Sequence, residues 1–114
     1  GDVYKRQPNE LGTALLPVID RGNVDVVFSA HNHTYGRSAP FKNGNVASQG
    51  TIYISSGRSG DKTWAGSRAK PQEVAFDGVL DQPNYMKLTV NDGKLIVTSL
   101  KQDGKLIDAV TLTK

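Results

Sequence analysis

The sequence is organised around residues 24–38, VDVVFSAHNHTYGRS. This stretch begins with a short apolar run that contains a single aspartate, and the run leads into His31 and His33, the only two histidines of the chain. β-branched residues between a Gly-Asn pair and a polar segment predict a buried strand. In extended backbone, residues i and i+2 project to the same side, so both imidazoles would leave the end of this strand in one direction.

The two histidines are candidate metal ligands. Imidazoles that project together can bind one metal ion, or one each of two ions. Histidine pairs also occur by chance as surface or hydrogen-bonded residues, so the spacing alone leaves both interpretations open. The position favours metal binding, because α/β folds place their ligand sites just past the ends of buried strands.

The composition of the chain limits which class of protein it can be and which kinds of site it can contain. The chain has 114 residues, which is one domain or part of one. It has no cysteine, which excludes thiolate metal sites, disulfides and thiol catalysis. The net charge is +3, but Lys and Arg are scattered rather than gathered in a stripe with aromatic residues, so nucleic-acid binding is not expected. No apolar stretch approaches the length of a membrane span.

The segment before the central stretch divides into two parts. Residues 1–7, GDVYKRQ, have no apolar period and join awkwardly to the segment after them, so we treat them as an artefact or junction. Residues 8–21 carry Leu11, Leu15 and Val18 at helical spacing, which predicts a helix. Pro17 lies inside this pattern and predicts a kink or a late start of the helix. The helix and the strand over residues 24–29 then form one αβ unit.

The middle of the chain contains one further strand between two predicted loops. Residues 51–55, TIYIS, predict a short buried strand. Residues 34–49 are polar and rich in Gly and Asn, which predicts a loop. Residues 61–82 show little period and predict a long excursion without regular structure.

The last thirty residues predict a three-strand antiparallel meander. From residue 85 the apolar period changes to two, and the runs are separated by Asn-Asp-Gly and Gln-Asp-Gly. Asp-Gly between alternating runs is a strong hairpin signal. The inner face is predicted to carry the apolar residues Met86, Leu88, Val90, Leu106, Val110 and Leu112.

The central stretch resembles a metal-binding motif of a known family. It is similar to the last such motif of the calcineurin-like metallophosphoesterases, and most of all to their purple acid phosphatase branch, where Gly-His-x-His precedes Tyr, Glu and Arg. The strings GTIYISSGRSG and KLTVNDGKLIVTSLKQDGKLIDAVTL also resemble the final strands of that branch. The resemblance implies an α/β (α+β-like) fold. Residues 8–114 would be the C-terminal part of a two-layer β-sandwich flanked by helices and ending in the meander.

The resemblance also implies a function and a set of site residues. His31 would bind one metal and His33 the other, in a dinuclear centre of Fe with Zn, Mn or Fe that hydrolyses a phosphoester substrate. Tyr35 and Arg37 would line the phosphate site, Arg37 as a bidentate donor. Packing for Tyr35 and a structural ion pair for Arg37 are equally good interpretations. Enzymes of this branch are generally exported, which implies an extracellular setting.

The sequence departs from the family at several points. Ala30 and Gly36 stand where the branch usually has Gly and Glu. The family's other ligands, in Asp-x-His, Gly-Asp and Asn-His blocks and at a further His, lie upstream of the His-x-His motif, and no such upstream blocks are present here. Two histidines are too few for a catalytic metal site. We therefore expect the chain to be inactive alone. A metal-free β-sandwich binding or adhesion module is the alternative function, and a basic nucleic-acid binder is a more distant third.

Overall fold

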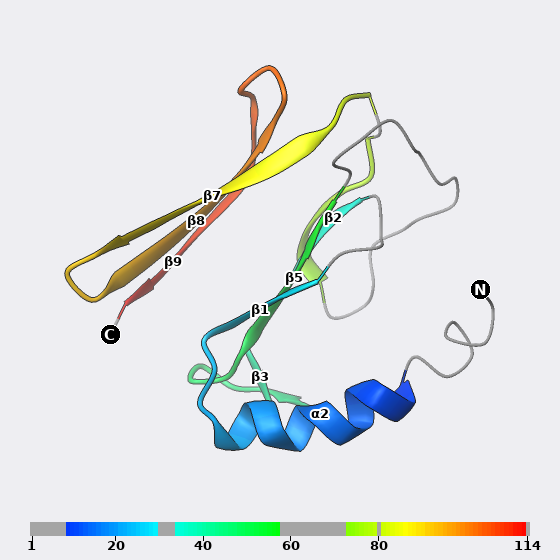
Figure 1. The fold of residues 1–114 in the computed structure, drawn as a ribbon, viewed down its shortest axis with the longest axis vertical. Coiled ribbons are helices and arrows are strands. Elements are labelled where there is room, and N and C mark those ends of the chain that lie inside the picture. Colours follow the sequence, from blue (N-terminus) through cyan, green and yellow to red (C-terminus); the bar gives the residue numbers. More distant parts are fainter. Residues whose placement is uncertain (1–8, 30–33, 58–72, 80, 114) are drawn as a thin grey trace.

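The computed structural model describes residues 9–29, 34–57, 73–79 and 81–113, which form one helix, two larger sheets that pack together, and a two-stranded hairpin (Figure 1). The predicted metal ligands His31 and His33 lie outside the described residues. Within these ranges, no helix is both long and apolar enough to cross a lipid bilayer.

The helix α2 (Asn9–Arg21) occupies the predicted segment and continues through Pro17. The late start considered from the sequence is therefore wrong. The helix ends where Asn23 adopts a left-handed φ of 52° and the Gly22 amide donates to the carbonyl of Val18 at 2.9 Å. Asn tolerates this conformation better than most residues do, so the Gly-Asn pair is a natural helix terminator.

The first sheet is mixed and has the strand order β1-β5-β2-β6. Its strands are β1 (Val26–Ser29), β5 (Ile52–Ser56), β2 (Tyr35–Ser38) and β6 (Glu73–Asp77). β1 runs parallel to β5, whereas β2 is antiparallel to both β5 and β6. The two strands predicted from apolar runs, β1 and β5, are confirmed as strands, and they lie side by side. β5 is largely buried as predicted, but β1 is half-buried at Val26 and Val27 and exposed at Phe28, so the prediction that β1 is buried is wrong.

Two predicted loops contain strands. Residues 34–49 hold β2 and a short hairpin of β3 (Phe41–Lys42) and β4 (Asn45–Val46), so the loop prediction is wrong there. The hairpin turns at Asn43 and Gly44, which both have positive φ, the geometry for which Asn-Gly is favoured. Residues 73–77, placed in the long excursion, form β6. β2 and β6 are strands because each has a neighbour to pair with, and neither has a clear apolar alternation of its own.

The second sheet is the predicted meander. It consists of β7 (Asn84–Asn91), β8 (Lys94–Lys101) and β9 (Leu106–Thr113), all antiparallel and in the order β7-β8-β9. Asp92 and Gly93 turn the chain with φ of 46° and 76°, and Gly104 does so with φ of 90°. The Asp-Gly pairs therefore act as the sequence indicated.

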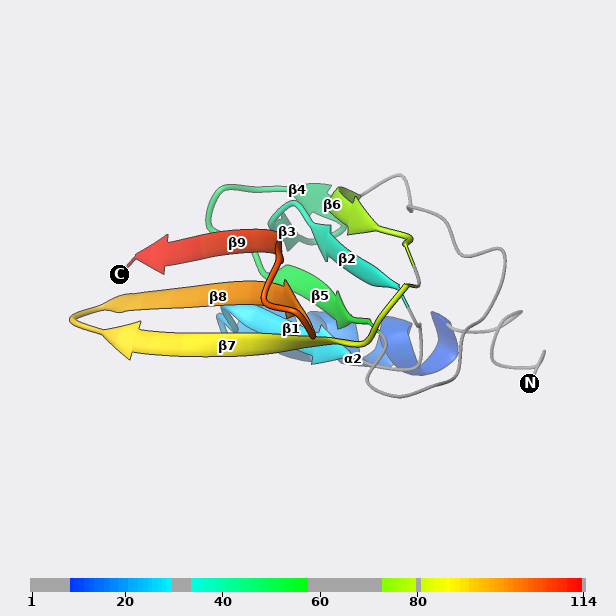
Figure 2. The ribbon, with the colours of Figure 1, turned by 90° about the horizontal axis from the view of Figure 1, so that it is seen from above.

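The predicted inner face of the meander is confirmed in part. Met86, Val110 and Leu112 pack against the core. Leu88 and Val90, with 49% and 79% of their surface exposed, remain open to solvent. The meander strands have eight residues each and the facing strands β2 and β5 have four and five, so one end of the meander extends past the first sheet (Figure 2).

A β-bulge corrects the prediction for Leu106. Leu106 pairs with Leu100 and Asp108 pairs with Ser99, so Ile107 is the extra residue between two paired positions. The bulge changes which side chains point inward. Leu106 is therefore 63% exposed, and Ile107 packs against the core in its place.

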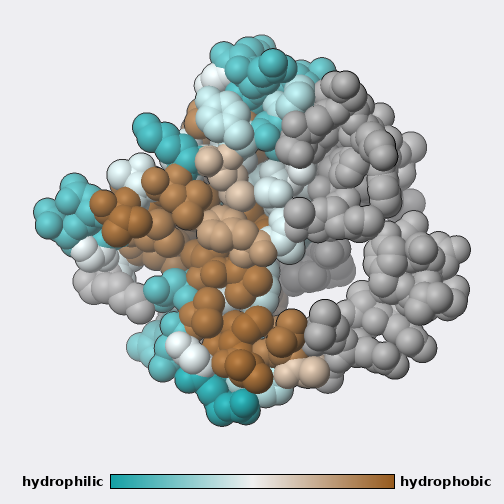
Figure 3. All heavy atoms as spheres, in the orientation of Figure 1, coloured by the Kyte–Doolittle hydropathy of each residue, from teal (hydrophilic) through white to brown (hydrophobic). Residues whose placement is uncertain are grey.

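The core lies between the two sheets. Its buried apolar members are Tyr35 of β2, Ile52 and Ile54 of β5, and Val97 of β8. This two-layer arrangement of a mixed sheet and a three-strand antiparallel meander, with one short helix, confirms the predicted fold class. Apolar side chains also remain exposed along β1 and α2, and Figure 3 shows hydrophobic surface from the meander down to the helix.

Candidate functional site

The end of β1 and the start of β2, which flank the predicted metal ligands, both pair with the carboxyl end of β5. Ser29, the last residue of β1, pairs with Ser55 on one side of β5. Tyr35, the first residue of β2, pairs with Ser56 on the other side. The strand before the histidines thus ends where the sequence predicted. The described residues on both sides of 30–33 therefore lie at one edge of the first sheet.

Serine hydroxyls fix both of these flanking segments to β5. Ser29 Oγ donates a hydrogen bond to the carbonyl oxygen of Ile54 at 3.3 Å. Ser55 Oγ donates to the carbonyl oxygen of Thr34, also at 3.3 Å, and both of these residues are buried. Thr34 directly follows His33 in the chain, so the exit from the histidine segment is anchored in the sheet.

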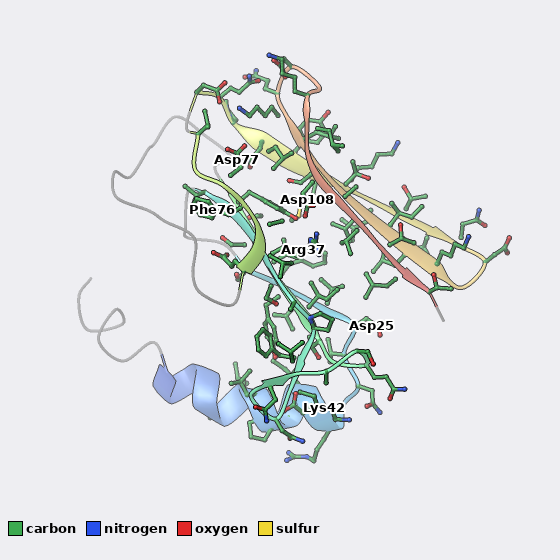
Figure 4. All side chains as sticks on the ribbon, turned by 180° about the vertical axis from the view of Figure 1, so that it is seen from behind. Asp25, Arg37, Lys42, Phe76, Asp77 and Asp108 are labelled. Atoms are coloured by element: carbon green, nitrogen blue, oxygen red, sulfur yellow. The ribbon has the colours of Figure 1, made fainter. Side chains whose placement is uncertain are left out.

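Tyr35 and Arg37 meet Asp108 of β9 between the two sheets. The two residues are i and i+2 on a strand and share a face. The Tyr35 hydroxyl and the Arg37 Nε both donate to Asp108 Oδ2 at 2.6 Å, and Arg37 Nη2 donates to Oδ1 at 3.2 Å. Figure 4 shows Arg37 and Asp108 pointing toward each other from β2 and β9. The arrangement ties the strand that follows the histidines to the last strand of the meander.

The charges of this cluster are set by its geometry. Burial acts to raise the pKa of Asp108, but hydrogen bonds from Arg37 and Tyr35 outweigh it and hold that pKa below its ordinary value. The pKa of Tyr35 is raised by burial and by its hydrogen bond to Asp108. The hydrogen bond to Asp108 likewise raises the pKa of Arg37. At neutral pH the cluster is a carboxylate, a guanidinium and a neutral phenol.

These contacts agree with the structural interpretation of Tyr35 and Arg37 that the sequence left open. Only 1% of the surface of Tyr35 is exposed, and Arg37 forms an ion pair with Asp108. Binding of substrate by the two residues stays a prediction. Asp108 was missed because it lies 71 residues from Arg37. The sequence did contain a signal for Asp108. It lies at an inward-facing position of the strand that also carries Val110 and Leu112, and a buried charge requires a charged or hydrogen-bonding partner.

Gly36, which stands where the purple branch commonly has Glu, lies under a carboxyl group from the next strand. Gly36 is buried on β2, and a Cβ added there would collide with the carboxyl of Glu73 on β6. Because Gly36 alternates with Tyr35 and Arg37, this carboxyl lies on the opposite face of the sheet from Asp108. The glycine thus leaves room for a carboxyl group that another strand supplies.

Gly36→Ala is expected to lower the free energy of unfolding by about 1 kcal/mol, because the Glu73 side chain must leave its present position. Urea unfolding measures the effect. In a Glu73→Ala background the same substitution should be neutral or slightly stabilising, because alanine loses less backbone entropy on folding. An equal cost in both backgrounds would show that the collision with Glu73 is not the cause.

The donor set for a metal is incomplete in the part of the chain that the structure describes. Those residues contain no group of three or more His, Asp or Glu side chains placed to hold a metal ion. His31 and His33, outside the described residues, offer two imidazoles, which suit zinc and iron. Two imidazoles are fewer donors than a catalytic metal ion usually takes from a protein, so a centre that includes them would need further ligands.

Comparisons with known proteins bear on the fold. No protein-family model matches the sequence, and no curated protein matches it. Among solved structures, the chain is similar to a purple acid phosphatase isolated from yellow lupin (Lupinus luteus) seeds, with 22% sequence identity and a TM-score of 0.64. The similarity covers 87% of this chain and 19% of the phosphatase chain, so the chain spans about a fifth of that protein. The mixed sheet and the meander thus have the fold of part of a purple acid phosphatase-like domain.

Proposed function

We propose that this chain is the C-terminal part of a dinuclear metallophosphoesterase of the purple acid phosphatase type. In this proposal His31 and His33 contribute one imidazole to each of two metal ions, Fe with Zn, Mn or Fe, and the substrate is a phosphoester. The same proposal includes export of the protein from the cell.

The proposal is supported chiefly by the place of the histidine segment in the fold. The strand ends that flank it lie at the carboxyl edge of the first sheet, and the fold is similar to that of a purple acid phosphatase. Ligand sites of α/β sheets lie at such edges. The hydrogen bond from Ser55 to the Thr34 carbonyl anchors the residue that directly follows His33 in the chain.

The residues of this chain would act mainly by binding and positioning. A bound metal pair supplies a nucleophilic water at neutral pH and a clamp for phosphoryl oxygens. His31 and His33 would hold the ions as neutral ligands. Arg37 would orient the phosphate, since a guanidinium has five N–H donors and Asp108 accepts hydrogen bonds from two of its nitrogen atoms. Tyr35, as a neutral phenol, would limit access of water to Arg37.

The test starts from the coding sequence upstream of Pro8. It should contain Asp-x-His, Gly-Asp and Asn-His blocks. The protein that includes them should bind about two metal ions per chain and hydrolyse a chromogenic phosphate monoester. The 114-residue chain, as the matched control, should show no hydrolysis. An in-frame stop codon just before Pro8, with no such blocks nearby, would contradict the proposal.

A further inference from the structure

Among the residues that the structure describes, two side chains of the meander have a buried polar atom without a hydrogen-bond partner. These atoms are Oγ of Ser99 on β8 and Oδ1 of Asn84 on β7. Ser99 is 0% exposed, so bulk water does not reach its hydroxyl. Most buried polar atoms in proteins are paired, and an unpaired one destabilises the fold. Two such atoms on adjacent strands therefore indicate a shared partner.

The two side chains are neighbours between the sheets. Ser99 pairs with Met86, and Asn84 lies two residues before Met86 on the same face of β7. Asn84 and Ser99 are thus diagonal neighbours across the two strands, a relation that separates residues by about 7–8 Å. The Asn84 amide also lies against Gly57, directly after β5, where an added Cβ would come within 2.5 Å of Nδ2. The amide therefore points from the meander toward the first sheet.

A water molecule suits this pair of atoms better than an ion does. Asn84 Oδ1 is an acceptor and needs a donor, which an anion does not supply. Ca²⁺ takes about six to eight oxygen ligands, and these two side chains offer only two. Water can donate to Oδ1 and accept from the Ser99 hydroxyl. Both side chains extend beyond their backbone positions, and two hydrogen bonds of about 2.8 Å each span the distance that is left.

We propose that Ser99 and Asn84 bind one buried water molecule between the two sheets. The water links β7 with β8, where Ser99 lies opposite Asp108 of β9. It extends the polar contacts between the layers from the Asp108 cluster to the edge strand of the meander. The site lies within the described residues and does not depend on the proposed metal centre.

The first test counts long-lived internal water molecules in the full chain by magnetic relaxation dispersion of the water signal. Ser99→Ala removes the hydroxyl with little change of volume, and it should hold one water fewer than the wild type. Thr98→Val is the matched control, because Thr98 is the preceding residue of β8 and faces the opposite side of the meander. It loses a hydroxyl and should keep the count. Equal counts in the wild type and a folded Ser99→Ala protein would overturn the inference.

Urea unfolding gives a second test, in which the two interpretations of Ser99 have opposite signs. If the water is bound, Ser99→Ala should lower the urea midpoint, because the Asn84 oxygen then stays buried without a partner. If the hydroxyl is simply unpaired, alanine should raise the midpoint, because a buried polar group has been removed. A raised midpoint would contradict the proposal. A lowered midpoint with no loss of water would assign the hydroxyl to a direct bond with Asp108 and would contradict it as well.

Asn84→Ala tests whether both side chains bind the same water molecule. This variant should also hold one water fewer than the wild type, and the double variant with Ser99→Ala should lose no second one. The shift of the urea midpoint in the double variant should then be smaller than the sum of the two single shifts. Loss of two water molecules, or additive shifts, would show that the two atoms do not share a partner.

Discussion

His33→Ala, made in a protein that includes the upstream ligand blocks, is expected to abolish phosphomonoesterase activity and to remove close to one metal ion per chain. Metal ions contribute several kcal/mol to stabilisation of phosphoryl-transfer transition states, so the loss in turnover should be at least about a thousandfold. The fold should remain, because the buried core between the sheets is formed by side chains of β2, β5 and β8. Metal analysis and turnover of a chromogenic phosphate ester measure the two effects together.

Two further variants frame this prediction. His31→Ala should remove the neighbouring metal instead, so the two histidine variants should lose different ions if the centre is heterometallic. Asn32→Ala, as the matched control, retains both histidines and should keep both metals. Full occupancy and activity in His33→Ala would show that this histidine has no ligand role, and the dinuclear proposal would then be wrong.

Asp108→Ala is expected to lower the free energy of unfolding of the chain by about 3 kcal/mol. The substitution removes the acceptor of three hydrogen bonds, one of them from a fully buried tyrosine, and leaves the Arg37 guanidinium without its carboxylate. Urea unfolding measures the change. Asp103→Ala is the control. Its carboxylate accepts exposed hydrogen bonds from the Lys105 amide at 2.9 Å and from Gln82 Nε2 at 3.2 Å, and its ion pair with Lys105 is long, at 3.9 Å, so the variant should change stability by about 1 kcal/mol or less.

The same variant has a defined pH dependence. The pKa of Asp108 is lower in the folded chain than its ordinary value of 3.8, so its contribution to stability is present in full above that value. It is lost as the pH falls through the folded pKa, where the carboxylate takes up a proton. The difference between wild type and Asp108→Ala should therefore be constant near neutral pH and shrink below about pH 4. A difference that persists unchanged at about pH 2 would show that packing, rather than charge, causes it.

The sequence predicted the elements whose signals are local. The meander follows from alternating apolar residues and from turns whose Asp and Gly adopt positive φ. β1 and β5 follow from short β-branched apolar runs between turn residues, although only β5 is largely buried in the core. The strand before His31 and the pair of Tyr35 and Arg37 were also found, because the motif places them next to one another in the chain.

The missed features depend on partners far away in sequence. β2 is polar and contains a glycine, and it becomes a strand because β5 and β6 pair with it on both sides. Leu106 was assigned to the wrong face because a bulge shifts the alternation by one residue, and no turn residue marks that bulge. Asp108 was missed as a member of the candidate site, because only the packing of the two sheets brings it to Tyr35.

The separation of Arg37 and Asp108 along the chain also has a consequence for biosynthesis. The ribosome adds roughly 5–20 residues per second, and 71 residues separate the two partners, so β2 is made about 4 to 14 s before the carboxylate that holds it. During that interval Tyr35 and Arg37 have no anchor in the second layer, and the apolar side of β5 is uncovered. The nascent chain should therefore be most prone to chaperone capture and aggregation after β5 has emerged and before β9 is complete.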